Sequence, residues 1–407
     1  MRRISLPLAL TMALVGVSAG SDWLHFRGTD NQSVSDQKDL PKTFSDAENV
    51  AWKVPLPGRG PSSPLVVAGR VVVTCSSGPR GDRLHVLALD AATGNLLWER
   101  QLWATGSTVC HPFGAVADNT PASNGKLIFA LYSSNDLACF DLDGNLKWLR
   151  GLTYDYPTAR NEAGMGSSPL VVGDVVIVQL ENQGESFVAG IDIASGETRW
   201  RLERQHDAVW CSPTVLRGKT PEEDIVLLET QGLLAGHDPR TGKVLWEYEA
   251  DCHTIASCTT CGDTIFLPAN GLHALRYDPA TRSIERLWYE PNLRGDNSSP
   301  VAYDDRVYRL KPPGILMCGD AADGQVLWQL RLKGPIWATP VLADGHLYVV
   351  NHDGLVQVAR LGQQGELVGT SQIDPGILAS PAVADGAIYF RSDAHLWKVA
   401  FNSEANP

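Results

Sequence analysis

The 407-residue sequence is short of positive charge. It has 34 Lys and Arg against 46 Asp and Glu, a net charge of −12, and no basic run. Proteins that bind nucleic acid or an anionic membrane surface need such basic clusters. We therefore expect neither partner, and we interpret the acidity as a surface that keeps the protein in solution.

Long apolar runs are also lacking, apart from one at the N-terminus. Residues 4–17 are apolar, follow Arg2 and Arg3, and lead to a small-residue ending at Ala19. This layout is typical of a secretory signal peptide, residues 1–19, that is cleaved after Ala19, with an uncleaved anchor as the alternative. No cysteine follows the run, so we expect no lipid anchor. We predict an exported monomer, periplasmic or secreted, without a direct membrane span.

Sequence motifs for catalysis or metal binding are missing or incomplete. There is no Walker or H-E-x-x-H pattern. Cys258 and Cys261 are three residues apart in a predicted strand, so their thiols face opposite sides and do not converge on one metal. We expect mostly unpaired cysteines, and one local disulfide, from Cys252 to Cys258 or Cys261, stays open as an alternative.

One segment imitates the start of a calcium-binding loop. Asp141, Asp143 and Gly144 have the spacing of such a loop, but Leu152 stands where a bidentate glutamate is expected. The same segment coincides with a repeated hairpin. The pattern therefore indicates a turn, and we predict no metal site.

What the sequence contains in abundance is internal repetition. A phrase of Ser or Thr, Pro, an apolar run and a Gly or Asp turn recurs every forty to fifty residues. One copy has Cys258 in place of the proline. The prolines of the other seven copies are Pro64, Pro121, Pro169, Pro213, Pro300, Pro340 and Pro381.

A second phrase, "ALDAATGNLLW" at residues 88–98, is repeated within the copies. Each full copy then holds four short strands, which predicts an all-β, eight-bladed β-propeller of four-stranded antiparallel blades. The last copy supplies only three strands. Residues 49–56 provide the missing one, so the N-terminal strand closes the ring. We assign residues 49–407 to the propeller and residues 20–48 to an ordered lead-in on its outside.

The second phrase resembles the tryptophan-docking repeat of pyrroloquinoline-quinone (PQQ) dehydrogenases and of their cofactor-free, BamB-like relatives. The resemblance implies that each blade is held to the next by a buried indole, beside a small residue two positions before the turn aspartate. Copy five has Arg276 at that small site, and copy seven lacks both aspartate and tryptophan. The expected docking residues are Trp52, Asp90, Trp98, Asp141, Trp148, Asp192, Trp200, Asp238, Trp246, Trp288, Asp320 and Trp328.

The resemblance favours a binding module over an enzyme. The vicinal cysteine pair of PQQ enzymes is missing, and the acidic residues of the repeats are explained by turns. We predict a BamB-like scaffold or ligand-binding propeller without a cofactor. Its partner would be an envelope or extracellular protein, or a small ligand. The alternative is an exported quinoprotein oxidoreductase using PQQ with calcium, or a carbohydrate-active enzyme that uses the mouth of the ring.

The connectors between blades indicate where binding would take place. Those that lead into the Ser-Pro strands emerge on one face, and the two longest are residues 103–120 and 153–166. Loops on one face of a rigid ring are the usual place for recognition. The candidate residues of this mouth are Arg59, His111, Asn119, Tyr154, Tyr156, Arg160, Asn161, Glu162, Trp210, Arg294, Asn297 and Trp337.

Overall fold

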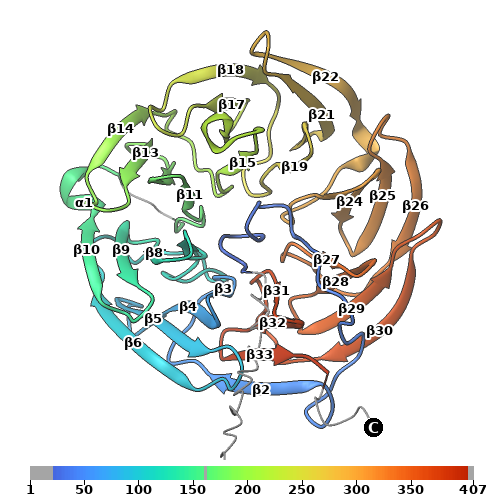
Figure 1. Cartoon of the computed structure of the whole chain (residues 1–407), viewed down its shortest axis with the longest axis horizontal. Coiled ribbons are helices and arrows are strands. Elements are labelled where there is room, and N and C mark those ends of the chain that lie inside the picture. The colour runs from blue at the N-terminus through green and yellow to red at the C-terminus, as the bar shows by residue number, and fades with distance from the viewer. Residues whose placement is uncertain (1–21, 160–162, 402–407) are drawn as a thin grey trace, which may run out of the picture.

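The computed structural model describes residues 22–159 and 163–401 and confirms the predicted fold. Eight antiparallel sheets stand around a central axis (Figure 1). In each sheet the innermost strand begins just after the Ser-Pro phrase, and the outermost strand carries the tryptophan where one is present. The predicted signal peptide lies outside the described residues.

The first four blades follow the chain in order. Blade 1 contains β3 (Leu65–Val67), β4 (Arg70–Ser77), β5 (Arg83–Asp90) and β6 (Leu96–Trp103). Blade 2 contains β7 (Ala122–Ser123), β8 (Leu127–Leu131), β9 (Asp136–Asp141) and β10 (Leu146–Gly151). Blade 3 contains β11 (Leu170–Val172), β12 (Val175–Leu180), β13 (Phe187–Asp192) and β14 (Thr198–Glu203). Blade 4 contains β15 (Thr214–Leu216), β16 (Ile225–Thr230), β17 (Leu233–His237) and β18 (Val244–Glu249).

The last four blades complete the circle. Blade 5 contains β19 (Thr259–Cys261), β20 (Thr264–Ala269), β21 (Gly271–Asp278) and β22 (Ser283–Glu290). Blade 6 contains β23 (Val301–Tyr303), β24 (Arg306–Lys311), β25 (Ile315–Asp320) and β26 (Val326–Arg331). Blade 7 contains β27 (Val341–Ala343), β28 (His346–Val350), β29 (Leu355–Arg360), β30 (Glu366–Gln372) and, from the lead-in, β1 (Val34–Ser35). Blade 8 contains β31 (Ala382–Ala384), β32 (Ala387–Arg391), β33 (His395–Val399) and β2 (Val50–Pro55).

The ring is closed as predicted, by strands from the two ends of the propeller. Strand β2 pairs antiparallel with β33, and Lys53 lies opposite Trp397 in the register. The pairing gives blade 8 its outermost strand and covers an edge that would otherwise be free. Helical segments are short and lie in connectors: α1 (Leu152–Asp155), η1 (Pro221–Glu223) and η2 (Pro291–Leu293). No helix in the described part is long and apolar enough to cross a membrane.

Indole side chains join neighbouring blades at the rim. Trp200 of blade 3, for example, donates its Nε1 hydrogen to the carbonyl of Pro239 in blade 4, at 2.9 Å. Gly242, at φ +71°, stacks on the same ring, so close that a Cβ there would lie 2.7 Å from the indole. A buried indole thus contributes both apolar area and one hydrogen bond to such a junction. The tryptophans that donate in this way are Trp52, Trp98, Trp148, Trp200, Trp288 and Trp328.

The turn aspartates hold the hairpins onto which the indoles pack. Each accepts a hydrogen bond from the backbone N–H two residues further on, which stabilises a tight turn. These aspartates are Asp90, Asp141, Asp192, Asp238 and Asp320. At Asp141 the Lys147 side chain, 2.8 Å away, also pairs with the carboxylate and lowers its pKa.

Blade 5 departs from the pattern, in a way that corrects one expectation. The residue opposite Trp288 is Ala274, not Arg276, because the hairpin of this blade is longer. Arg276 is exposed instead. In the longer hairpin no carbonyl accepts the Trp246 Nε1 hydrogen, which has no partner in the described chain. The Trp246 ring lies beside Tyr277, with ring centroids 6.1 Å apart.

The lead-in does not lie on the outside of the ring, as the sequence suggested. It enters the central channel, where Figure 1 shows the blue segment near the axis, and contacts the innermost strands of several blades. Trp23 pairs with Val66 of blade 1, and the Arg27 side chain donates to Thr214 Oγ1 of blade 4 at 3.0 Å. Strand β1 then runs parallel to β27 of blade 7. The expectation failed because polar side chains in this segment find partners inside the channel.

The lead-in next runs outward and closes the one junction that has no tryptophan. Gly369 of β30 takes the position that tryptophan has in the other blades, opposite Val358. The backbone of Lys42 fills the space, since a Cβ on Gly369 would lie 2.0 Å from its carbonyl oxygen. Phe44 stacks on Phe390 of blade 8, with ring centroids 5.6 Å apart. The lead-in therefore replaces the missing indole between blades 7 and 8.

Candidate functional site: the mouth of the ring

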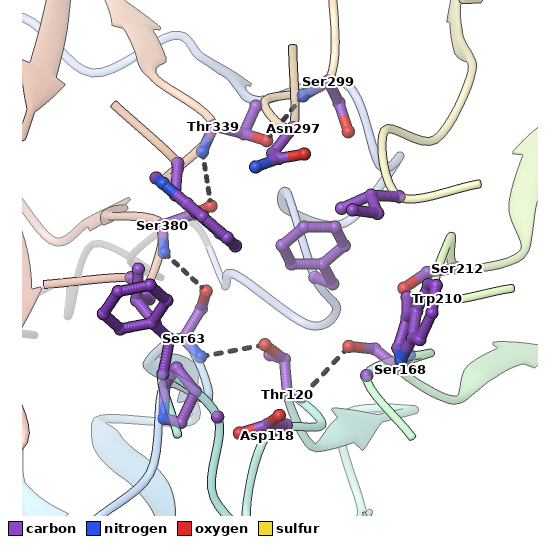
Figure 2. A pocket seen from close by; sticks show the side chains of 18 of the residues that line it. Ser63, Asp118, Thr120, Ser168, Trp210, Ser212, Asn297, Ser299, Thr339 and Ser380 are labelled. Carbon is purple, nitrogen blue, oxygen red and sulfur yellow. Dashed lines mark hydrogen bonds between the residues drawn. The ribbon is translucent and has the colours of Figure 1, made fainter. Parts of the chain in front are cut away.

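A closed circle of hydroxyl groups surrounds the axis at the mouth. The residue before each Ser-Pro proline, or before Cys258 in blade 5, donates its backbone N–H to the hydroxyl oxygen of the corresponding residue in the next blade. Figure 2 shows part of this circle. We call this set the hydroxyl ring. Its members are Ser63, Thr120, Ser168, Ser212, Ser257, Ser299, Thr339 and Ser380.

The hydroxyl ring explains why the Ser-Pro phrase is repeated. Each step joins two blades over 2.8 to 3.0 Å, and the step from Ser380 to Ser63 closes the circle. A buried backbone N–H without a partner is costly, so each hydroxyl satisfies a donor that the blade itself leaves unpaired. A hydroxyl oxygen that accepts one bond keeps further hydrogen-bonding capacity. The hydroxyl ring thus connects neighbouring blades near the axis and also gives the mouth a polar lining.

A cavity of about 380 Å³ opens at the hydroxyl ring, and most of the surface that lines it is apolar. Four large aromatic residues line it, and they come from four different segments: Phe26 from the lead-in, Phe113, Trp210 and Trp337. Trp210 is fixed in place because its Nε1 donates to the Gly164 carbonyl at 2.7 Å. The cavity is therefore lined by aromatic side chains together with the polar hydroxyl ring.

The connector 103–120 leads from blade 1 to blade 2 and brings Phe113 to residues of blade 7. The Phe113 ring lies 5.7 Å from Trp337 and 5.6 Å from His352, both edge-on. Arg59 holds this connector, since its Nη2 donates to the Phe113 carbonyl at 3.2 Å and its Nε pairs with Asp393 at 2.7 Å. The length of this connector, noted in the sequence, thus positions one wall of the cavity.

Asp118 supplies the only carboxylate among the described residues that line the cavity. Its Oδ1 accepts the Ala115 N–H at 2.6 Å. Burial raises the pKa of Asp118 to about 7, although that hydrogen bond and the Arg59 guanidinium act in the opposite direction. No Lys or Arg is found among these lining residues. The cavity therefore combines aromatic faces with one acidic group that no lining cation neutralises.

Of the predicted mouth residues, His111, Trp210, Asn297 and Trp337 line the cavity. Arg59 lies beside it, as described above. Asn119 is fully buried and donates to the Ser167 carbonyl at 2.6 Å, so it joins blades 2 and 3 and does not face the cavity. Arg294 lines a second cavity, between blades 5 and 6.

The remaining predicted residues belong to the connector 153–166. Tyr154 is 75% exposed, and Tyr156 packs on Phe187 with ring centroids 4.4 Å apart; neither lines the cavity. Arg160, Asn161 and Glu162 lie outside the described residues.

Three of the lining residues that sequence reasoning missed contribute an aromatic ring or a carboxylate. Phe113 and Asp118 lie in the same connector as His111 and Asn119, and the apolar or acidic character of a loop residue was a signal that could have found them. Phe26 was missed because the lead-in was placed outside the ring. The hydroxyl ring was noticed only as a repeat marker, since a Ser-Pro dipeptide carries no information on which blade its hydroxyl contacts.

The donor atoms do not fit a metal-held quinone. Within residues 22–159 and 163–401, no three or more His, Cys, Asp or Glu side chains form a group that could hold a metal ion. Asp118 and Asn297, which could offer oxygen ligands, lie on different sides of the cavity (Figure 2). All eight cysteines are in the described part of the chain and all are free, so the alternative disulfide is not formed.

Comparison with known proteins agrees with the resemblance in the repeats. The family model described as outer membrane protein assembly factor BamB matches residues 44–167, 157–258 and 275–368. BamB of Moranella endobia (strain PCIT) is 25% identical over 279 residues, which cover 65% of this chain and 64% of that protein. BamB of Escherichia coli (strain K12) is 26% identical over 195 residues, or 47% and 43%. The chain thus spans less than two thirds of the length of these curated relatives.

Solved structures show the same architecture at lower identity. The crystal structure of BamB from Moraxella catarrhalis is 17% identical, with a TM-score of 0.64 over 88% of this chain and 99% of that one. A europium-containing methanol dehydrogenase is 15% identical, with a TM-score of 0.69 over 92% and 90%. At these identities the likeness shows the fold alone. Because the family match extends over more than half of its residues, the chain belongs to the PQQ-repeat β-propeller family of the outer membrane protein assembly factor BamB.

Proposed function

We propose that the protein is an exported scaffold that binds a partner in the cell envelope, and that the mouth of the ring is its recognition surface. The observation that supports this most is the aromatic cavity, because the side chains that line it differ from one repeat to the next. The rim repeats the same indole hydrogen bond at six of its eight junctions, whereas the mouth contains different side chains from different connectors. Side chains that depart from a structural repeat are the ones free to serve recognition.

An enzymatic function is the weaker candidate. The fold is shared with dehydrogenases, but fold alone does not carry activity. The lining offers one carboxylate and no cluster of metal ligands among the described residues. We therefore expect no dye-linked alcohol or sugar oxidation after incubation with PQQ and calcium, and turnover in that assay would contradict the proposal.

The scaffold proposal is tested by cross-linking and capture from an envelope extract. The full chain is the bait, and a double variant, Trp210→Leu with Trp337→Leu, removes two walls of the mouth. Leu97→Ser is the matched control, because Leu97 is 48% exposed at the rim. We expect outer-membrane assembly proteins with the unmodified bait and the control, and at least a fivefold loss with the double variant. Equal recovery by all three baits would place recognition elsewhere.

A further inference from the structure

The mouth cavity has the chemistry of a site for a positively charged organic group. Aromatic faces attract cations within about 6 Å of the ring, and the attraction grows when water is excluded. Here Phe26, Phe113, Trp210 and Trp337 line one cavity with the carboxylate of Asp118. Since no Lys or Arg stands among the described lining residues, the acidic group is not neutralised from within the cavity.

We propose that this cavity binds an alkylammonium group, held between the aromatic side chains and Asp118. The inference rests on the proposed function, since it names what the recognition surface recognises. The cavity of about 380 Å³ falls within the range of roughly 300–1,000 Å³ that small-ligand sites occupy. It has room for a quaternary or primary ammonium with a short apolar substituent.

The remaining lining is compatible with such a group. Seven members of the hydroxyl ring face the cavity, all but Ser257. Each accepts one backbone hydrogen bond, so its oxygen retains a lone pair for the N–H of a primary ammonium, whereas a quaternary ammonium has no N–H and would be held by the aromatic rings and Asp118 alone. An anion would instead meet Asp118 and the negative faces of the aromatic rings. The charge of the lining therefore selects a cation over an anion.

The first test uses the unmodified full chain and two probes of equal shape. Choline carries a quaternary ammonium, and 3,3-dimethylbutan-1-ol is its neutral carbon counterpart. We expect titration calorimetry to show choline binding at least about tenfold more tightly, because only the cation gains from the rings and the carboxylate. Equal affinity of the two probes, or no binding of choline, would overturn the proposal.

Matched variants then locate the site. Asp118→Asn keeps the shape of the side chain and removes its charge, so choline should bind about tenfold more weakly. Asp353→Asn is the control, because the exposed Asp353 follows His352 at the same mouth but does not line the cavity. An equal loss in both variants would point to general electrostatics of the face and would contradict the assignment. Circular dichroism of each variant checks that it is folded.

Two further probes distinguish the source of the ammonium group. Capped lysine, Nα-acetyl-lysine methylamide, represents a side chain of a protein partner, and its Nε-acetylated form is the uncharged control. Binding of capped lysine but not of the acetylated form indicates a partner's side chain, whereas binding of choline alone indicates a free small molecule. Both results support a cation site. If these titrations show no binding, the capture experiment with envelope extract still tests the scaffold proposal. If the capture experiment recovers no partner, the titrations still test the cation site.

Discussion

Two tryptophans ten residues apart show how differently the chain uses one residue type at the rim and at the mouth. Trp200 and Trp210 both donate Nε1 to a backbone carbonyl, that of Pro239 and that of Gly164. Trp200, however, is only 9% exposed between two blades, whereas Trp210 lines the open cavity. Equivalents of Trp200 recur around the ring, whereas the position of Trp210, three residues before the proline of the Ser-Pro phrase, holds different residues in other copies, among them Asp118, Asn297 and Trp337. The comparison teaches that repetition marks the contacts that hold the ring, and departure from it marks the candidate site.

The largest effect should follow from removing a rim indole. We expect Trp200→Ala to lower the free energy of unfolding by about 3–5 kcal/mol, because the variant loses buried apolar area and leaves a cavity between blades 3 and 4. Trp103→Ala is the control, since Trp103 is 66% exposed, and it should lose less than about 1 kcal/mol. Urea unfolding measures both. Similar losses would mean that the rim indoles do not hold the blades together.

The junction without a tryptophan sharpens the comparison. If Phe44 replaces the indole between blades 7 and 8, then Phe44→Ala should destabilise the protein by about 3 kcal/mol. Phe401→Ala serves as the control because Phe401 is 56% exposed. Thermal unfolding of the two variants checks the expectation. A Phe44 variant as stable as the Phe401 variant would show that the lead-in is not part of the rim.

The hydroxyl ring can be tested with two adjacent serines. Ser168 accepts the Thr120 N–H at 3.0 Å, while the buried Ser167 Oγ has no partner in the described chain. We expect Ser168→Ala to cost about 1–2 kcal/mol, since it leaves a buried N–H unpaired. Ser167→Ala should cost less than about 0.5 kcal/mol. If chemical denaturation shows that Ser167→Ala loses more unfolding free energy than Ser168→Ala, the hydroxyl ring does not hold the blades together.

The smallest effect is a pH dependence at the mouth. Burial raises the pKa of Asp118 to about 7, so the carboxylate is mostly neutral at pH 6 and mostly ionised at pH 8. Choline affinity should therefore increase by up to about tenfold over that interval. Asp118→Asn should abolish the increase, and the same titration calorimetry measures it. An unchanged pH profile in that variant would assign the effect to another group.

Other ionisable groups face Asp118 and must be controlled in that titration. Arg59, Arg391 and Asp393 act on it through their charges, and Cys110 lies close by. His111 lines the same cavity. Repeating the titration with His111→Gln and with Cys110→Ser separates their contributions from that of Asp118. The profile should persist in both variants.

The fold was predictable because the signals for it are repeated. The Ser-Pro phrase and the tryptophan phrase each occur often enough that one irregular copy does not hide the period, and the three-strand last copy required β2 to close the ring. The longer hairpin of blade 5 was misaligned by two residues. Counting back from the turn aspartate does not detect the extra residues of this hairpin, whereas the strand pairing, which places Ala274 opposite Trp288, does.

The mouth was predictable only in part, because it depends on contacts between segments that are distant in the sequence. That Trp210, Asn297 and Trp337 would share a cavity followed from their equivalent places in the repeat. That Phe26 would join them did not, since no local pattern in residues 22–33 indicates a channel. Phe113 of the connector between blades 1 and 2 contacts Trp337, which leads into blade 7, and the path of a long connector is not encoded in its length.

The most direct test of the difference between rim and mouth measures two quantities on two variants. Trp200→Leu and Trp210→Leu are each compared with the unmodified chain in unfolding free energy and in choline affinity. We predict that Trp200→Leu loses stability and keeps its affinity, and that Trp210→Leu keeps most of its stability and binds choline at least about fivefold more weakly. If Trp210→Leu instead loses as much stability as Trp200→Leu with unchanged affinity, the mouth is one more structural contact and the account is wrong.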